Sequence, residues 1–448
     1  MAILRRKKAA PADAAAAVPS FEFKPTAFPK AESQGVLIAA RQLPGFPSAA
    51  GLLASALAAR GDRIWLDYTA AAAAVRFRVD GVWENKDPME RAAGDAALVV
   101  IKRIFGMEPN ERKARQVGSC VLSEKKGDWV AECTSQGMSG GERVLISIEP
   151  KKATLKTLEE LGMREQTRES FRSLINAHDG MVLISAPPGH GLPTTWRIAI
   201  DTADKFVSDW VSLEDAAAPE PEIINVTAHR FDSAEGEKPQ ERLYKALLKQ
   251  PDVFVLPRMY NEEVVRQVLD QLQGGGKHAV TQVAARDAID GVLQLLTANR
   301  KHAVELLKSL KGVLNQRLIR RLCTACRQPF APSPQLLQKL GIPAGRVGQL
   351  YQPTVIPPGQ QASDEKGNAV PPCSECSGRG YNGRFAIFEL LALDDTLRKV
   401  IMQQAKNPDA IRQFAKQKGH VGLQEEGVLA VAMGHTSLQE LQRVLSGK

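Results

Sequence analysis

The residues whose types and spacing come closest to a chemical site lie between positions 185 and 195. This segment reads Ser-Ala-Pro-Pro-Gly-His-Gly-Leu-Pro-Thr-Thr, follows the apolar run 181–184 and opens a helical pattern. A glycine-rich turn between a strand and a helix can cradle phosphates, and the motif G-x-x-x-x-G-K-[ST] adds a lysine for the phosphates and a hydroxyl for magnesium. When the segment is aligned on Gly189 and Gly191, those two positions hold Leu192 and Pro193. The pattern predicts the layout of a nucleotide site without the two side chains that hold the nucleotide.

These two substitutions limit what the loop can do. Leu192 cannot neutralise charge on a γ-phosphate, and the loss of one preorganised donor of this kind costs roughly 10²–10³ in rate. Pro193 supplies neither a hydroxyl nor a backbone N–H, although proline suits the first turn of a helix. We therefore interpret the segment as a structural turn. The alternative is a weak anion site formed by the helix N-terminus and Arg258.

A second candidate site is a set of four cysteines. Cys323 and Cys326 form one Cys-x-x-Cys pair, and Cys373 and Cys376 form another. Four thiolates at this spacing can close a tetrahedral zinc site, and a site with no open position is structural rather than catalytic. The metal would tie together the ends of a Pro/Gly-rich segment, 330–372. The alternatives are four unliganded thiols and, less favoured, a disulfide or redox pair.

The elements that must position these residues follow from the spacing of apolar runs. Between residues 180 and 320, helical patterns alternate with short apolar runs at 181–185, 210–213, 253–256 and 279–283. Strands separated by helices indicate βαβ units and a mainly parallel sheet. Upstream, apolar and polar residues alternate around Asp80-Gly81, which is a hairpin signal. The sequence therefore predicts an α/β fold in both halves.

Composition bounds the domains and the partners. The 448 residues suffice for two or three domains, no apolar run is long enough for a membrane span, and the basic N-terminus lacks the apolar region of a secretory signal. The net charge of +9 suits an acidic partner, although a solvated surface is the slightly favoured interpretation. The predicted segments are a disordered basic Ala/Pro-rich tail (1–35), an N-terminal α/β domain (36–150), a linker (151–177) and a second domain (178–448) with a zinc subdomain (323–388) and a helical tail (389–448). Short helices are expected from residue 386 onward, the last opened by a capping box at Thr436.

Several motifs in a fixed order resemble one family. They are an Arg-x-Arg-x-Asp-Gly strand, the segments around both cysteine pairs and two C-terminal segments, at 76–81, 315–323, 376–384, 388–391 and 434–440. From about residue 50 onward, the chain resembles the GspE/PilB family of type II secretion and type IV pilus assembly ATPases. The resemblance implies an N-terminal α/β domain and a RecA-like P-loop NTPase-type domain with a tetracysteine zinc subdomain and a helical C-terminal tail.

The departures from the family pattern are as systematic as the matches. By the resemblance, Glu132 and Ser147 take the places of arginines that reach the phosphates from the N-terminal domain. The positions of the phosphate lysine, the magnesium hydroxyl, the catalytic glutamate and the box histidine are degenerate: Leu192, Pro193, Arg258 and Ala284. The residues that remain for a weak nucleotide site are Gly189, Gly191, Thr194, Glu214, Asp215 and Asp252. We expect the two acids at 214 and 215 to pair with basic neighbours such as Arg258.

This combination predicts a homologue that keeps the structure of the family and has lost catalysis. We expect structural zinc and no working site for ATP and magnesium. The resemblance implies a cytoplasmic protein, peripheral to the inner membrane, that acts as a platform or regulatory subunit of a secretion or pilus machine. Its partners would be inner-membrane platform proteins and, in a homo- or hetero-hexamer, active paralogues.

Two alternatives stay open at this point. One is an active ATPase with a rearranged site. The other is a nucleic-acid-binding protein that uses the zinc knuckles and the basic residues around them. Sparse aromatic residues near those basic residues disfavour nucleic acid, because stacking platforms need them.

Overall fold

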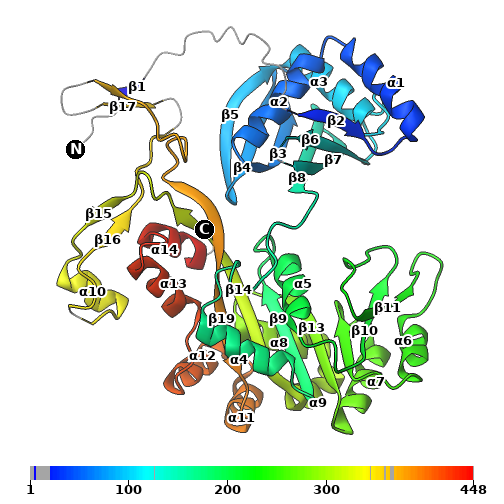
Figure 1. Ribbon diagram of the computed structural model, residues 1–448, viewed down its shortest axis with the longest axis vertical. Helices are drawn as coiled ribbons and strands as arrows, with labels where there is room; N and C mark the ends of the chain where they lie inside the picture. The colour runs from blue at the N-terminus through cyan, green and yellow to red at the C-terminus, as the bar shows by residue number, and fades with distance from the viewer. Residues whose placement is uncertain are drawn as a thin grey trace. The chain divides into compact units, whose positions relative to one another are not determined.

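Figure 1 shows the computed structural model, which describes residues 5–6, 21–125, 127–343, 345–357, 360–363 and 368–446. Its contacts separate two compact units, the first within residues 7–154 and the second within residues 155–448. The short strand β1 (Arg5–Arg6) belongs to the second unit because it pairs with β17 (Gln360–Ser363). Among the described residues, no helix has the length and apolar character needed to cross a bilayer.

The first unit is a seven-stranded antiparallel sheet packed against helices. The strand order is β2-β6-β7-β8-β3-β4-β5. Ile64 and Phe77 of the sheet share one core with Leu53 and Ile101 of the helices. The strands are β2 (Glu22–Pro25), β3 (Gly61–Tyr68), β4 (Ala72–Val79), β5 (Val82–Glu90), β6 (Gln116–Glu124), β7 (Gly127–Met138) and β8 (Gly141–Pro150), and the helices are α1 (Lys30–Arg41), α2 (Phe46–Ala58) and α3 (Arg91–Ile104).

The hairpin predicted at Asp80-Gly81 is confirmed. Strands β4 and β5 pair in antiparallel register, with Val79 opposite Val82. Asp80 has φ 50° and Gly81 has φ 81°. Two successive positive φ angles are what a two-residue turn of type I′ requires, and this turn matches the twist of the flanking strands.

The predicted disordered tail over residues 1–35 is wrong for the part of it that is described. Strand β2 pairs with β6, and α1 begins at Lys30. Phe21 and Phe23 are buried in the core of the first unit, because alternate residues of an extended chain lie on one face. Two buried aromatic residues are too short a pattern to stand out from an Ala/Pro-rich composition. The remainder of the predicted tail, 1–4 and 7–20, lies outside the described residues.

The second unit is built on another seven-stranded sheet, in the order β11-β10-β12-β13-β9-β14-β19. All neighbouring pairs are parallel except β14 with β19. The four strands predicted from apolar runs are present as β9 (Gly180–Ala186), β10 (Trp210–Asp215), β12 (Val253–Leu256) and β13 (His278–Ala284). Three further strands complete the sheet: β11 (Val226–Phe231), β14 (Leu310–Leu322) and β19 (Tyr381–Ala392).

Helices cover both faces of this sheet (Figure 1). Met181 and Leu183 of β9 pack in one core with α7 and α8, whereas Val182 and Ile184 pack in a second core with α4 and α5. A strand buried on both faces must be apolar throughout, which explains the run that the sequence shows. The helices are α4 (Glu165–Ile175), α5 (Leu192–Thr202), α6 (Pro239–Leu247), α7 (Glu262–Gln273), α8 (Ala288–Ala298) and α9 (Ala303–Ser309).

The segment from residue 386, expected to begin the short helices, begins as a strand. Residues 386–392 complete β19, and the helical tail starts only with α11 (Asp395–Gln404). Phe388 lies in the core beside α4 and α5, while Leu391 lies in the core beside α8. Periodicity cannot distinguish a short apolar run that is buried on both faces from a piece of helix. The other tail helices are α12 (Pro408–Gln417), α13 (Leu423–Ala432) and α14 (Leu438–Ser446).

The last helix is capped one residue later than predicted. The Ser437 hydroxyl accepts a hydrogen bond from the Glu440 backbone N–H at 3.2 Å. The Thr436 hydroxyl instead donates to the backbone carbonyl of Arg320 at 2.8 Å. The cap therefore belongs to Ser437, because a tertiary contact with β14 already uses the hydroxyl of Thr436.

The segment between β14 and β19 has more regular structure than its Pro/Gly content indicates. Its described part contains β15 (Gln328–Phe330), α10 (Pro334–Leu340), β16 (Leu350–Gln352) and β18 (Ala369–Val370), besides β17. The predicted linker also contributes to the core, since Phe171 and Ile175 of α4 are fully buried.

Candidate functional site

The loop predicted as a degenerate nucleotide site lies at the carboxyl end of the second sheet, between β9 and α5. Asp215 ends β10, Ala284 ends β13, and Arg258 follows β12 closely. Parallel strands end on the same side of a sheet, and ligands of open α/β sheets bind there. The structure therefore brings these three positions to the side of the sheet where the loop lies.

The loop is fastened to β14 by side chains. Gly189 and Gly191 have φ 79° and 83°, so the tight turn is present. The Gln316 amide donates to the His190 carbonyl at 2.7 Å and its oxygen lies 2.5 Å from the Thr195 hydroxyl. The backbone N–H of Leu318 donates to Nδ1 of His190 at 3.1 Å. Sequence reasoning assigned no role to Gln316, because its contacts join segments more than a hundred residues apart.

The residue at the lysine position of the motif has a packing role. Leu192 is partly buried and packs against the core that α5 shares with the sheet. Pro193 and Thr194 are exposed at the start of the helix. A leucine that packs against this core supplies no cation for a phosphate at this position.

The two acids that end β10 have partners other than the expected Arg258. Glu214 is buried, accepts a hydrogen bond from Ser212 at 2.5 Å and pairs with Arg230 at 3.2 Å. A hydrogen bond from Ser233 lowers the pKa of Asp215, and the nearby charge of Arg258 lowers it further. Arg258 itself is exposed. It thus acts on Asp215 through its charge and forms no ion pair with either acid.

Asp252 does not lie with the loop and the residues at the carboxyl ends of the strands. It precedes β12, so it lies at the amino end of the parallel strands. Its carboxylate accepts a hydrogen bond from the backbone N–H of Asp209 at 2.9 Å and lies 3.7 Å from Lys277. These contacts join the starts of neighbouring strands, on the opposite side of the sheet from the loop.

The four predicted metal ligands do come together. The sulfur atoms of Cys323, Cys326, Cys373 and Cys376 all lie within 4.8 Å of one another. Two of the separations are 3.8 and 3.6 Å, while tetrahedral Zn–S bonds of about 2.3 Å place sulfur atoms about 3.8 Å apart. These separations are far too long for disulfides, and all four thiols are free. The donor set fits zinc.

The metal site joins the far ends of two strands. Cys323 directly follows β14, and Cys376 precedes β19 by a few residues. The backbone N–H of Gly380 donates to the sulfur of Cys376 at 3.3 Å. We call the described residues between 316 and 387 the zinc arm, since they include the parts of β14 and β19 that extend past the last β9 partner, Asn315.

A family comparison agrees with this arrangement of loop, sheet and cysteines. The model of the family described as type II/IV secretion system protein matches residues 47–443. The chain belongs to this family. The predicted resemblance to GspE and PilB is thereby confirmed.

Relatives in the secretion family match most of this chain. The type IV pilus assembly ATPase PilB of Thermus thermophilus is 27% identical over 370 residues, which are 82% of this chain and 39% of that protein. The type II secretion system protein E of Dickeya dadantii is 27% identical over 371 residues, which are 83% of this chain and 69% of that protein. The chain thus spans well under half of the Thermus relative.

A solved structure supports the fold of this secretion-family chain. The Legionella pneumophila ATPase DotB superposes with a TM-score of 0.52 at 13% identity, over 89% of this chain and 95% of that chain. Identity this low speaks for the fold alone. Together with the sheet order and the cysteine cluster, it confirms the predicted α/β fold class.

In the first unit of this secretion-family protein, the charged strand residues are used within the sheet. Arg76 pairs with Asp67 at 2.6 Å, and Arg78 pairs with Asp62 at 2.7 Å. Glu132 and Ser147 are cross-strand neighbours on β7 and β8. Asp80 is in the hairpin turn and pairs with Arg60 at 3.1 Å.

The contact between the loop and β14 predicts a pH dependence. Burial, together with the nearby charges of Arg317, Arg384 and Arg443, lowers the pKa of His190 to about 4. Between its unfolded pKa of about 6.5 and the folded value, only the unfolded chain binds the proton, so the contribution of His190 to stability is complete above pH 6.5 and is lost as the pH falls toward 4. We expect the denaturation midpoint of the wild type to fall over this window more steeply than that of H190Q.

Denaturant titrations of both proteins at half-unit pH steps would measure this difference. Taking the difference between the two proteins removes the titration of other histidines, such as His278, whose pKa burial also lowers to about 4. Parallel curves for wild type and variant would show that His190 is not held neutral by the fold.

Proposed function

We propose that this protein is a catalytically degenerate member of the secretion and pilus ATPases, and that it serves as a cytoplasmic platform or regulatory subunit of a type II secretion or type IV pilus machine. The observation that carries the proposal is Leu192 at the lysine position, where it is partly buried and packs against the core. Phosphoryl transfer depends on positioned charge rather than on covalent chemistry by the protein, so a site without the cation, the hydroxyl and the carboxylate has lost its means of catalysis.

The surroundings of the loop support the same interpretation. Gln316 and the backbone of β14 already bond to the carbonyl and to Nδ1 of His190. Glu214 is held by Ser212 and Arg230 rather than left open for magnesium. Of the two acids that could serve magnesium, Glu214 is therefore engaged within the protein, and the positions of the lysine and the hydroxyl hold Leu192 and Pro193.

The platform role follows from what the fold keeps. Zinc would stabilise the arm, and the sheet has a packed core on each face, so the chain keeps a folded scaffold with surfaces free for partners without the chemistry of the family. We propose that these surfaces contact inner-membrane platform proteins, either directly or within a hexamer that includes active paralogues. In such a ring an inactive subunit would determine how the active subunits are arranged or how many of them the ring contains.

The test is a calorimetric titration of the zinc-loaded protein with Mg-ATP, with hydrolysis assayed on the same sample. We expect no turnover above the blank, because the loss of one preorganised donor alone costs roughly 10²–10³ in rate and several are missing. Binding without turnover would support a nucleotide-sensing subunit and would still support the loss of catalysis. Turnover that D215N abolishes would overturn the proposal in favour of an active ATPase with a rearranged site.

The nucleic-acid alternative is less well supported. The arginines near the cysteines are engaged: Arg320 and Arg443 pair with Glu440 at 2.6 Å, and Arg327 lies over the ring of Tyr351 at 4.1 Å. Arginines held by such contacts are less available to displace counterions from a phosphate backbone. Strongly salt-dependent binding to a random-sequence oligonucleotide would revive this alternative.

A further inference from the structure

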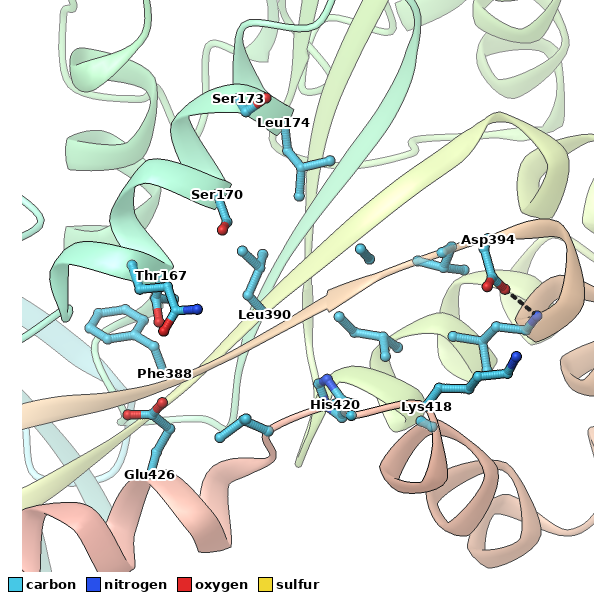
Figure 2. Close-up of a pocket in the computed structure, with 18 of the residues that line it drawn as sticks. Thr167, Ser170, Ser173, Leu174, Phe388, Leu390, Asp394, Lys418, His420 and Glu426 are labelled. Carbon is cyan, nitrogen blue, oxygen red and sulfur yellow. Dashed lines mark hydrogen bonds between the residues drawn. The ribbon is translucent and has the colours of Figure 1, made fainter.

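A cavity of about 910 Å³ lies in the second unit along the outer side of β19. Figure 2 shows β19 crossing it, with Thr167 and Ser170 of α4 on one side and Lys418 and His420 of the α12–α13 connector on the other. Helices α11 and α12 line the rest. We call this cavity the β19 groove. It is separate from the loop that follows β9.

Backbone groups of β19 point into this groove. The strand pairs on one side only, with β14, and in an antiparallel ladder alternate residues turn their N–H and C=O outward. Ala386 shows which set of alternate residues faces outward, because its N–H donates to the carbonyl of Leu161, outside the sheet, at 2.8 Å. Phe388, Leu390 and Ala392 therefore also face outward. None of these three N–H groups has a hydrogen-bond partner in the part of the chain that the structure describes.

The two walls differ in chemistry. Helix α4 lines the groove with the hydroxyls of Thr167, Ser170 and Ser173, whereas α11 and α12 line it with Leu397 and Phe414. Helix α4 belongs to the core on one face of the sheet, and α11 and α12 belong to the core on the other. A strand added beside β19 would therefore meet hydroxyls on one face and apolar side chains on the other.

Most of the charged side chains that line the groove are engaged within the protein, while Glu169 of α4 is exposed at its edge. Arg164 donates to Glu426 at 2.8 Å, and Nε2 of His420 lies 2.7 Å from Glu389. The ammonium of Lys418 lies over an aromatic ring of α12 at 5.8 Å. A ligand that complements these walls needs no charge of its own.

We infer that the β19 groove binds an extended, uncharged segment of a partner protein as an eighth strand of the sheet. Backbone N–H and C=O groups at alternate residues recognise an extended main chain, and the pockets beside them select its side chains. The pairing of Leu161 with Ala386 is already the first rung of such a ladder. Residues 388–392 offer the next rungs, about 16 Å at about 3.3 Å per residue. The inference concerns partner binding and is independent of the loss of catalysis.

The chemistry of the walls defines the sequence that the partner presents. Small polar residues should alternate with apolar ones, over about five positions, without charged residues. Selection of a phage-displayed library of random heptapeptides against the zinc-loaded full chain should enrich this alternation. Enrichment of charged or helix-forming sequences instead would overturn the inference.

Amide hydrogen exchange with one selected synthetic peptide locates the binding. The N–H groups of Phe388, Leu390 and Ala392 should exchange at least about tenfold more slowly when the peptide is bound. Those of Glu389 and Leu391, which already bond to β14, serve as internal controls and should not change. Protection that appears elsewhere, or that grows with protein concentration without peptide and so reports a second copy, would refute the assignment.

A matched pair of variants tests the main-chain bond itself. A392P removes an N–H that faces the groove and leaves the ladder with β14 complete, as an edge strand tolerates. A392V keeps the N–H. The peptide should bind A392P at least about tenfold more weakly than the wild type, and A392V should bind within about twofold. Equal binding to both variants would show that β19 does not pair with the peptide, and the exchange measurement decides the case if A392P does not fold.

Discussion

Substitution of Cys376 by serine is expected to abolish zinc binding and to unfold the zinc arm, while the rest of the sheet of the second unit stays folded. The wild type should hold about one zinc per chain. Because ligands of a structural metal are brought together only by folding, the binding free energy is also folding free energy, about 10–16 kcal/mol in zinc-finger peptides. The small core in which Leu350 packs with Phe385 and Leu441 is the part that depends on the arm. Metal analysis and hydrogen exchange over residues 316–387 would measure both effects.

The buried thiol of Cys120 provides the control for this substitution. It lies in the core of the first unit, whereas the four ligands belong to the second unit, so C120A should keep the full zinc content and the slow exchange of the arm. A C376S protein that retains one zinc, or a wild type that binds none after loading, would contradict the assignment of these four cysteines to a metal.

Removal of a buried carboxylate from the first unit is expected to cost about 3–5 kcal/mol of unfolding free energy. Lys102 and Glu142 form an ion pair in which both residues are almost fully buried, at 0% and 6% exposed. Glu142 also accepts a hydrogen bond from Ser135 at 2.7 Å, and the Lys102 ammonium donates to the Glu111 carbonyl at 2.6 Å. E142A leaves the ammonium buried without its counter-charge, and chemical denaturation would measure the loss.

An exposed pair in the same unit gives the matched control. Lys24 lies 3.7 Å from Asp128, and its side chain is 54% exposed. Exposed pairs contribute about 0–1 kcal/mol, so K24A should stay within that range. The double variant K102M/E142L should recover part of the loss, because apolar residues can replace a buried pair. Equal effects of E142A and K24A would mean that the pair at position 102 is solvated in solution.

The sequence predicted those features whose signal is local. The apolar run at 181–184 marks β9 because both of its faces are buried, and Asp80-Gly81 marks a turn because both residues adopt positive φ. The cysteine spacing predicted a four-sulfur cluster because few other arrangements use two Cys-x-x-Cys pairs.

The features that were missed depend on contacts between distant segments. The apolar–polar alternation typical of a strand is interrupted in β14 by three consecutive polar residues, Asn315, Gln316 and Arg317. These residues are polar because their side chains bond to the β9 loop and to neighbouring segments. Asp252 could have been placed correctly, since it precedes its strand and residues at that end lie opposite the loop. The partner of Glu214 could not, because Arg230 reaches it from β11, a strand that no apolar run indicates.

Strand β14 has a thermodynamic consequence for the whole second unit. Its middle residues hold the β9 loop through Gln316 and Leu318, and its end enters the metal cluster at Cys323. A single strand thus both orders the β9 loop and positions one ligand of the metal cluster. If release of the metal disorders the end of β14, the β9 loop becomes less ordered as well. Because coupling between two sites is reciprocal, a ligand that displaces the loop lowers the affinity for zinc by the same factor. Binding of a partner to the β9 loop would therefore change the affinity of the chain for zinc.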